Sequence, residues 1–196
     1  MTTTTTTLTV DVDWPVETEH LVLRPATLDG LDATWAFRRL DTVSRWLTRA
    51  PGGLQEYRQQ FADPDSLAKT LVITLNGNVI GELMVAIGDA WAQAEVIDAT
   101  KAVQADLGWS LNPDHTGRGF ATEALEAVLR NCFDELGLRR VTADCFAANE
   151  RSWRLMERGM RRGIHSVCDS LHRSGAWLDG YGYALLADEW RAAVVS

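Results

Sequence analysis

The chain has 196 residues, which is the size of one domain or at most two. Hydrophobic residues make up 46% of it and charged residues 23%, so a packed globular core is expected. The formal net charge of -8 argues against a general nucleic-acid or anionic-membrane binder, because such proteins present a basic face. A local basic pocket remains compatible with this charge.

The ends and the cysteines point to a single intracellular domain. Residues 1–13 begin with a threonine run that has neither the basic region nor the apolar stretch of a signal peptide, and we expect a disordered tail. No run of about 18 apolar residues is present for a membrane span. Three cysteines without a CxxC spacing disfavour a disulfide framework or a zinc site. We therefore expect one cytoplasmic domain over residues 14–196, with no metal.

Strand-like and helix-like segments alternate along the chain. A strong turn signal, Asn76-Gly77-Asn78, predicts a hairpin, and residues 89–101 have no clear period and are expected to form an inserted loop. Helices are expected at 28–40, 42–49, 54–61, 121–136 and 149–158. Strands are expected at 20–24, 67–75, 79–87, 105–111, 141–146, 164–171 and 177–186.

The clearest helix starts directly after a glycine-rich loop, Thr116-Gly117-Arg118-Gly119-Phe120-Ala121-Thr122. From Ala121 its apolar residues recur with helical spacing, and Gly137 provides a stop signal. The N-terminus of a helix presents unpaired N–H groups and a positive dipole end, which suit a phosphate. A turn that needs glycine only for its backbone geometry explains the same pattern equally well.

Two common phosphate-binding motifs do not fit this loop. The chain has no GxxxxGK[ST] string, which excludes a P-loop. The third position of a GxGxxG or GxGxxA fingerprint is Thr122, and the chain offers few of the parallel crossovers of a dinucleotide-binding sheet. A nicotinamide oxidoreductase is therefore a minor alternative.

Three blocks in order resemble the GNAT N-acetyltransferases, and in particular their RimJ/RimL-type branch. The central block ADLGWSLNPDHTGRGFATEA (105–124) is similar to the strand and W-G-[KR]-G-[YF]-A-T-E-A segment of that branch. NERSWRLMERGM (149–160) is similar to its NxxSxrvxeklGF block, and TEHLVLRPATLDGLDATWAF (18–37) to its opening. The resemblance covers about residues 16–187.

The resemblance implies an α/β (α+β) GNAT fold, a mixed and mostly antiparallel twisted sheet of about seven strands flanked by helices, with a splayed central strand pair. It implies an enzyme that transfers acetyl from acetyl-CoA to a primary amine by direct attack. The acceptor would be a protein N-terminus, a peptide or a small amine, and a homodimer is a further option. The alternative is a catalytically weak acyl-CoA-binding or sensing domain.

The resemblance also implies the cosubstrate site. The strand backbone would pair with the pantetheine arm and stabilise the oxyanion, the loop N–H groups would hold the pyrophosphate, and Asn149 would contact the pantetheine while capping its helix. Arg154 would reach a phosphate, or form an ion pair with Glu150 or Glu157. The acetyl-CoA-binding residues expected on this basis are Trp109, Ser110, Leu111, Thr116, Gly117, Arg118, Gly119, Phe120, Ala121, Thr122, Asn149, Ser152 and Arg154.

Two positions depart from the family pattern. Thr116 stands where the acyl-CoA loop has Gln or Arg, and Met156 stands where many members have a tyrosine that protonates the departing thiolate. In the RimJ/RimL branch the serine of NxxS is the suggested substitute, so Ser152 is the expected catalytic acid.

The catalytic base has three candidates. Asp106 and Glu82 lie on expected strands that border the cleft, and Asp144 is the third. Two-residue alternation places Asp106 on the less apolar face of its strand, where a solvated carboxylate is favoured over a catalytic one. Residues 40–57 and 89–101 are expected to set acceptor specificity, and Trp91 to line the acceptor pocket or a dimer contact.

Overall fold

The computed structural model describes residues 12–194, without the side chains of 161–169 and 194. Most of the tail expected at 1–13 lies outside this description. The expectation of one domain over 14–196 stays a prediction.

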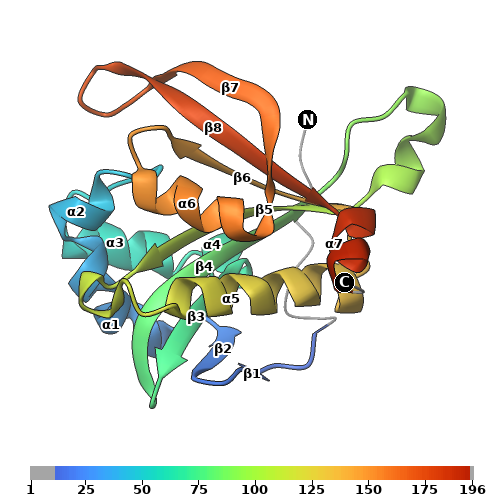
Figure 1. Ribbon diagram of the computed structural model, residues 1–196. Coiled ribbons are helices and arrows are strands. Elements are labelled where there is room, and N and C mark those ends of the chain that lie inside the picture. The colour runs from blue at the N-terminus through green and yellow to red at the C-terminus, as the bar shows by residue number, and fades with distance from the viewer. Residues whose placement is uncertain (1–11, 195–196) are drawn as a thin grey trace.

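The fold is built on one eight-stranded open sheet (Figure 1). The spatial order is β1-β2-β3-β4-β5-β6-β8-β7, and every neighbouring pair is antiparallel except β5 and β6. This confirms the predicted mixed, mostly antiparallel sheet. The strand that the sequence analysis missed is β1, which is only two residues long. The strands are β1 (Val16–Glu17), β2 (Leu21–Pro25), β3 (Thr70–Leu75), β4 (Asn78–Gly88), β5 (Gln104–Leu111), β6 (Arg140–Phe146), β7 (Arg161–Leu171) and β8 (Trp177–Leu186).

Helices cover both faces of the sheet. Figure 1 shows α5 and α6 on the near face and α1 to α4 behind the sheet. The helices are η1 (Leu28–Gly30), α1 (Leu31–Arg38), α2 (Asp41–Ser44), α3 (Leu54–Phe61), α4 (Pro64–Ala68), η2 (Ala94–Thr100), η3 (Pro113–His115), α5 (Phe120–Arg130), the π-helical turn η4 (Asn131–Glu135), α6 (Glu150–Gly159) and α7 (Ala187–Val194).

Several segments differ from the predicted ones. The helix expected at 42–49 ends at Ser44, and the segment that follows is held by turns. The strand expected from residue 67 starts at Thr70, because Pro64 opens a short helix whose first turn is capped by the side chain of Asp63. The segment 89–101 contains the 3-10 helix η2.

The main core lies between the sheet and α5. The predicted apolar stripe of α5 is buried, with Ala124 0% and Leu129 1% exposed, and it packs in one cluster with alternate residues of β4 and β5 such as Val85 and Leu107. The period of two along the strands and of 3.6 along the helix thus bring the two apolar faces together.

A polar network fixes α1 against the opposite face of the sheet. Arg38 of α1 donates to Glu82 of β4, and Ser110 Oγ of β5 donates to the same carboxylate oxygen at 2.8 Å. Glu82 is 5% exposed and Arg38 is half-buried, so this ion pair is largely removed from solvent. Removing one partner of such a pair leaves the other charge buried and unpaired, which makes the network a strong constraint on how α1 docks.

The two strands that run in parallel separate soon after they meet. The β5–β6 register contains only Gln104–Arg140, Ala105–Val141 and Asp106–Thr142. Beyond Asp106, β5 continues beside β4 alone, while β6 continues beside β8. This separation is the splayed central pair that the sequence comparison implied.

Leu129→Ala should destabilise the fold by about 2–5 kcal/mol, because it leaves a cavity in the main core. Urea unfolding gives the free energy of unfolding. Glu126→Ala, an exposed position on the same helix, is the control and should change it by less than about 0.5 kcal/mol. Equal effects of the two substitutions would contradict the packing described for α5.

Candidate active site

The separation of β5 and β6 leaves backbone groups without a strand partner. Asn112 N donates to Ile80 O of β4 at 2.8 Å, whereas Val103 O accepts from Arg139 N at the start of β6. Because backbone direction alternates along a strand, the N–H and C=O groups of Leu107, Trp109 and Leu111 point toward the gap. Ser110, expected with its neighbours to offer its backbone to acetyl-CoA, directs its backbone toward β4.

A cavity of about 1120 Å³ runs through this gap. It extends from the loop before α5 and the first turns of α6, on one face of the sheet, to the segment around α2 on the other. Of the predicted site residues, those that line it are Asp106, Trp109, Ser110, Leu111, Thr116, Gly117, Gly119, Phe120, Ala121, Thr122, Asn149, Ser152 and Arg154. Glu82 and Arg118 are not among its lining residues.

The glycine loop has the backbone that its sequence required. Gly117 and Gly119 have φ values of +76° and +85°, and Gly119 is the N-cap of α5. A Cβ added at either position would meet no atom within 4 Å, so the space over the loop is open. The loop N–H groups and the positive end of α5 therefore form a cradle suited to an anion. The hydroxyl of Thr116 is engaged within the loop, where it donates to Pro113 O at 2.9 Å.

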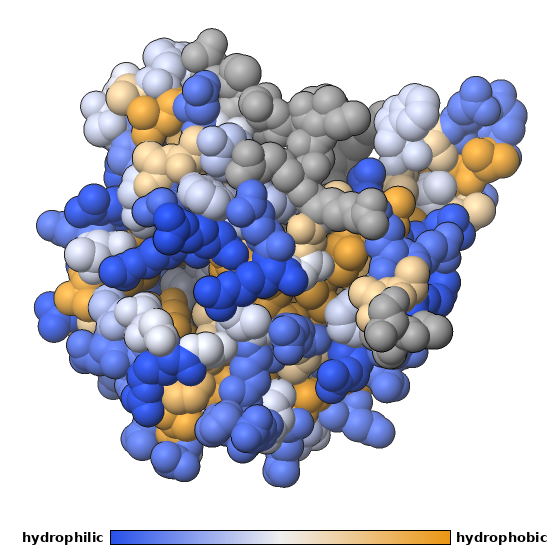
Figure 2. Space-filling model, viewed as in Figure 1, coloured by the Kyte–Doolittle hydropathy of each residue, from blue (hydrophilic) through white to orange (hydrophobic). Residues whose placement is uncertain are grey.

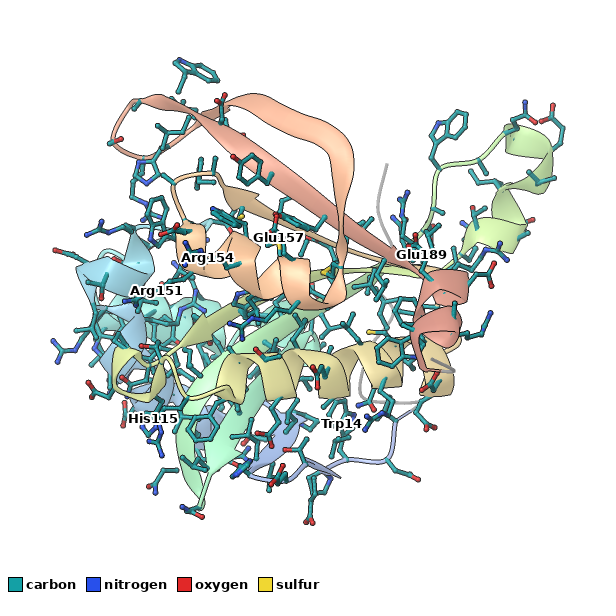
Figure 3. The ribbon with its side chains drawn as sticks, in the orientation of Figure 1. Trp14, His115, Arg151, Arg154, Glu157 and Glu189 are labelled. Atoms are coloured by element: carbon teal, nitrogen blue, oxygen red, sulfur yellow. The ribbon has the colours of Figure 1, made fainter. Side chains whose placement is uncertain are left out.

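Arginines surround the cradle. Arg118 lies over the ring of Phe120, 4.8 Å from its centroid. Arg151, Arg154 and Arg158 follow one face of α6 and line the cavity. Figure 3 shows Arg151 and Arg154 projecting from α6 on the side of the loop that carries His115. The surface around this end of α6 is strongly hydrophilic and hollowed (Figure 2).

Of the two carboxylates expected as ion-pair partners of Arg154, the one that it contacts is Glu150, and its contact with a phosphate stays a prediction. Arg154 donates to Glu150 at 2.7 Å, and both side chains are more than half exposed. An exposed i,i+4 pair of this kind contributes little to stability, so it leaves the guanidinium available to a phosphate.

The first turn of α6 carries the expected acid. Ser152 is half-buried and lines the cavity, and its N–H donates to Asn149 O at 3.0 Å. Met156, one turn further, is 1% exposed and also reaches the cavity wall. Ser152 and Met156 therefore line the same cavity one turn apart, and the role of Ser152 as the acid stays a prediction.

The three candidate bases have different surroundings. Glu82 already accepts from Arg38 and Ser110 and is buried. Asp106 and Asp144 are exposed and line the cavity from the adjacent strands β5 and β6. Partial loss of solvent around the Asp106 carboxyl, followed by the negative charge of Asp144, raises the pKa of Asp106, and a hydrogen bond from Thr142 opposes the rise. A carboxylate with a raised pKa is a stronger base.

The wall on the α2 side is held by the β7–β8 hairpin. His172 Nε2 lies 2.9 Å from Arg45 O, and the rings of Trp46, Phe146 and His172 contact one another at centroid distances of 5.2–6.3 Å. Of the segment 40–57, expected to set acceptor specificity, the residues that line the cavity are Thr42, Val43, Arg45, Trp46, Leu47 and Thr48.

The other expected specificity segment, 89–101, is not among the lining residues and projects from the far end of the sheet (Figure 1). The reason is topological, because this segment connects the end of β4 to the start of β5, whereas the cavity lies at the end of β5. Trp91, 91% exposed, therefore lies outside the cavity that it was expected to line.

Arg158, Phe146 and Tyr181 line the cavity and were not predicted from the sequence. Arg158 lies four residues after the predicted Arg154 and on the same helix face, so its spacing was a readable signal. Phe146 and Tyr181 gave no such signal, because strand pairing alone brings them to the cavity.

Two further structural findings concern metals and membranes. Among the residues described, no group of three or more His, Cys, Asp or Glu side chains is placed to hold a metal ion. Within the same residues, no helix is long and apolar enough to span a bilayer.

Comparison with known families gives one domain match. Residues 20–160 match the family model described as an acetyltransferase (GNAT) domain. The uncharacterized N-acetyltransferase YnaD of Bacillus subtilis is 39% identical over 87 residues, which are 43% of this chain and 50% of YnaD. The chain thus matches half the length of this relative.

Solved structures share the fold. A GNAT-family acetyltransferase from Bacillus anthracis superposes with a TM-score of 0.74 at 25% identity, covering 89% of this chain and 99% of that one. RimJ of Mycobacterium smegmatis, in complex with CoA-disulfide, has a TM-score of 0.66 at 22% identity and covers 89% of each chain.

Asp144→Asn should lower the pKa of the Asp106 carboxyl, because a neighbouring negative charge is removed. Carboxyl-detected NMR titration of the two proteins measures the change directly. Asp179→Asn is the matched control. Asp179 lies on β8, and its charge does not contribute to the raised pKa of Asp106. An unchanged Asp106 titration in Asp144→Asn would show that the two carboxylates do not interact.

Proposed function

Because this chain belongs to the GNAT acetyltransferase family, we propose that it moves the acetyl group of acetyl-CoA to a primary amine by direct attack. The single observation that carries the proposal is the cavity through the β5–β6 gap, with the anion cradle at one end. Such a passage lets one substrate enter from each face of the sheet.

The residues of the gap fit an acyl-CoA. Unpaired backbone groups of Trp109 and Leu111 support a pantetheine arm lying as an added strand, and one of these N–H groups would stabilise the oxyanion. The N–H groups of the loop from Gly117 to Thr122 would hold the pyrophosphate, with Arg151, Arg154 and Arg158 beside it. When bound, acetyl-CoA supplies the activated thioester.

The chain's own side chains would manage the protons. The attacking amine must be neutral, and we propose that Asp106, assisted by the charge of Asp144, takes its proton directly or through water. The hydroxyl of Ser152 would donate to the departing thiolate. Glu82 is assigned a supporting role, because both of its described hydrogen bonds hold the strands and α1 together.

The acceptor belongs to the class of primary amines. An α-amino group, with a pKa near ~8, is deprotonated at neutral pH more readily than a lysine amine near ~10.4. We therefore place a protein N-terminus, a peptide or a small α-amine ahead of lysine side chains.

Amine-dependent release of free thiol from acetyl-CoA, measured with a panel of amines, tests the proposal. We expect release that saturates with one class of amine. Gly119→Glu should abolish binding and release, since it puts a negative charge in the anion cradle. Gly119→Ala carries the same positive φ without the charge and should bind more tightly than Gly119→Glu. Tight acetyl-CoA binding without release for any amine would identify a sensing domain instead.

Ser152→Ala should lower kcat by about tenfold or more while leaving the KM for acetyl-CoA within about twofold, because the hydroxyl acts on the leaving group. Steady-state kinetics at several pH values measure both constants. An unchanged kcat would reject the acid role of Ser152. Ser44→Ala, at an α2 position outside the cavity lining, serves as the control.

A further inference from the structure

A second, smaller pocket opens beside the main cavity on the acceptor side of the sheet. Its volume is about 180 Å³, equal to that of several water molecules at about 30 Å³ each. Both cavities share the lining residues Leu47, Thr48, Met84, Gly108 and Trp109. We call this space the side pocket; it is completed by Arg38, Arg49, Thr70 and Glu82.

Two of the three charged residues that line the side pocket are arginines. The third, Glu82, accepts from Arg38 and from Ser110 through Oε1, and its charge is paired with that of Arg38, which leaves Arg49 as the further positive charge of the pocket. Glu82 Oε2 is buried without a hydrogen-bond partner among the described residues, so it favours a donor group or a bridging water next to the carboxylate. Arg38 Nε is buried and has no hydrogen-bond partner among the described residues. A buried donor without a partner costs free energy, and an added acceptor group would remove that cost.

The second arginine is free to turn toward the pocket. Arg49 is 70% exposed and contacts Glu56 at 3.4 Å, and Glu56 also accepts from Gly52 N at 2.8 Å. Exposed pairs of this length contribute little, so the guanidinium of Arg49 is available to a ligand. Guanidinium groups match the planar carboxylate with paired hydrogen bonds.

The position of the side pocket connects it to the reaction. Gly108 lines both cavities and shares one face of β5 with Asp106 and Ser110. Gly108 has no side chain, and the flexible side chain of Met84 lies 3.5 Å from the place that a Cβ at Gly108 would take. An amine between the proposed base Asp106 and the side pocket would therefore lie beside Met84. The two residues from Asp106 to Gly108 span about 7 Å along the strand, which is within the length of a small bifunctional molecule.

We infer that the side pocket binds a carboxylate of the acceptor, so that the acceptor of this chain is an amine that also carries a carboxylate. The inference rests on the proposed acetyl transfer. A free amino acid and a peptide with an acidic first residue share this chemistry. The amine of the acceptor would lie near Asp106 and Asp144 in the main cavity, and its carboxylate would bind Arg38 and Arg49.

Two matched acceptor pairs separate the two sources. The first pair is alanine and alaninamide, which differ in the α-carboxylate of a free amino acid. The second pair is aspartyl-alanine amide and asparaginyl-alanine amide, which differ in the side-chain carboxylate of the first residue of a peptide. Because amidation also changes the pKa of the amine, the quantity compared is the ratio of kcat/KM in the unaltered protein to that in Arg49→Gln, for each acceptor.

Arg49→Gln should lower kcat/KM about tenfold for the carboxylate member of at least one pair and leave the neutral members within about twofold. Arg58→Gln is the control, since Arg58 is an exposed α3 arginine that lines neither cavity. Equal ratios for charged and neutral members in both pairs would overturn the inference.

A binding measurement keeps the inference separate from the enzyme assay. Calorimetry on the protein saturated with CoA measures the affinity for the acetylated products. One pair is N-acetyl-aspartyl-alanine amide and N-acetyl-asparaginyl-alanine amide, and the other is N-acetylalanine and its amide. Tighter binding of a carboxylate form, lost in Arg49→Gln, supports a carboxylate site even without turnover. No preference in either pair means that water alone fills the side pocket, and overturns the inference.

Discussion

The early end of the pairing between β5 and β6 is the constraint on which the rest of the site depends. Three residue pairs join the strands, and each then continues beside a different neighbour. A parallel pair that separates leaves N–H and C=O groups inside the protein without partners, and such groups need a hydrogen-bonding ligand or water. The cavity follows from that separation, and so do the gap-facing backbone groups of Trp109 and Leu111. The same separation lets residues from both faces of the sheet line one cavity.

The two faces of the gap differ in charge, and this matches two different substrates. On the face of α5 and α6, the loop N–H groups and a row of arginines suit a polyanion. On the other face, Asp106 and Asp144 suit an amine, with the arginines of the side pocket nearby. A net charge of -8 is therefore compatible with binding a phosphorylated cosubstrate, because a small local cradle of N–H groups and arginines would be enough to hold it.

Residue spacing and residue type predicted the features that depend only on neighbours in the sequence. The stripe of α5, the glycines at positive φ before it and the hairpin at Asn76-Gly77 follow from spacing and residue type, and all are present. Contacts between distant segments had no such signal. The pairing of Arg38 with Glu82 joins residues 44 apart in the chain, and it removes Glu82 from the free carboxylates among which a base was sought. The position of 89–101 depends on which end of β4 and β5 faces the cavity, which sheet topology decides.

The central claim is that acetyl-CoA lies along β5 in the gap, and amide hydrogen exchange resolved by NMR tests it most directly. Acetyl-CoA should slow exchange of the gap-facing amides of Trp109 and Leu111, and it should change that of Ser110 much less, because the Ser110 amide points toward β4. Desulfo-CoA should slow the same amides, which would show that the effect comes from binding rather than acetylation. Unchanged exchange at Trp109 and Leu111 with the cosubstrate bound would contradict the account.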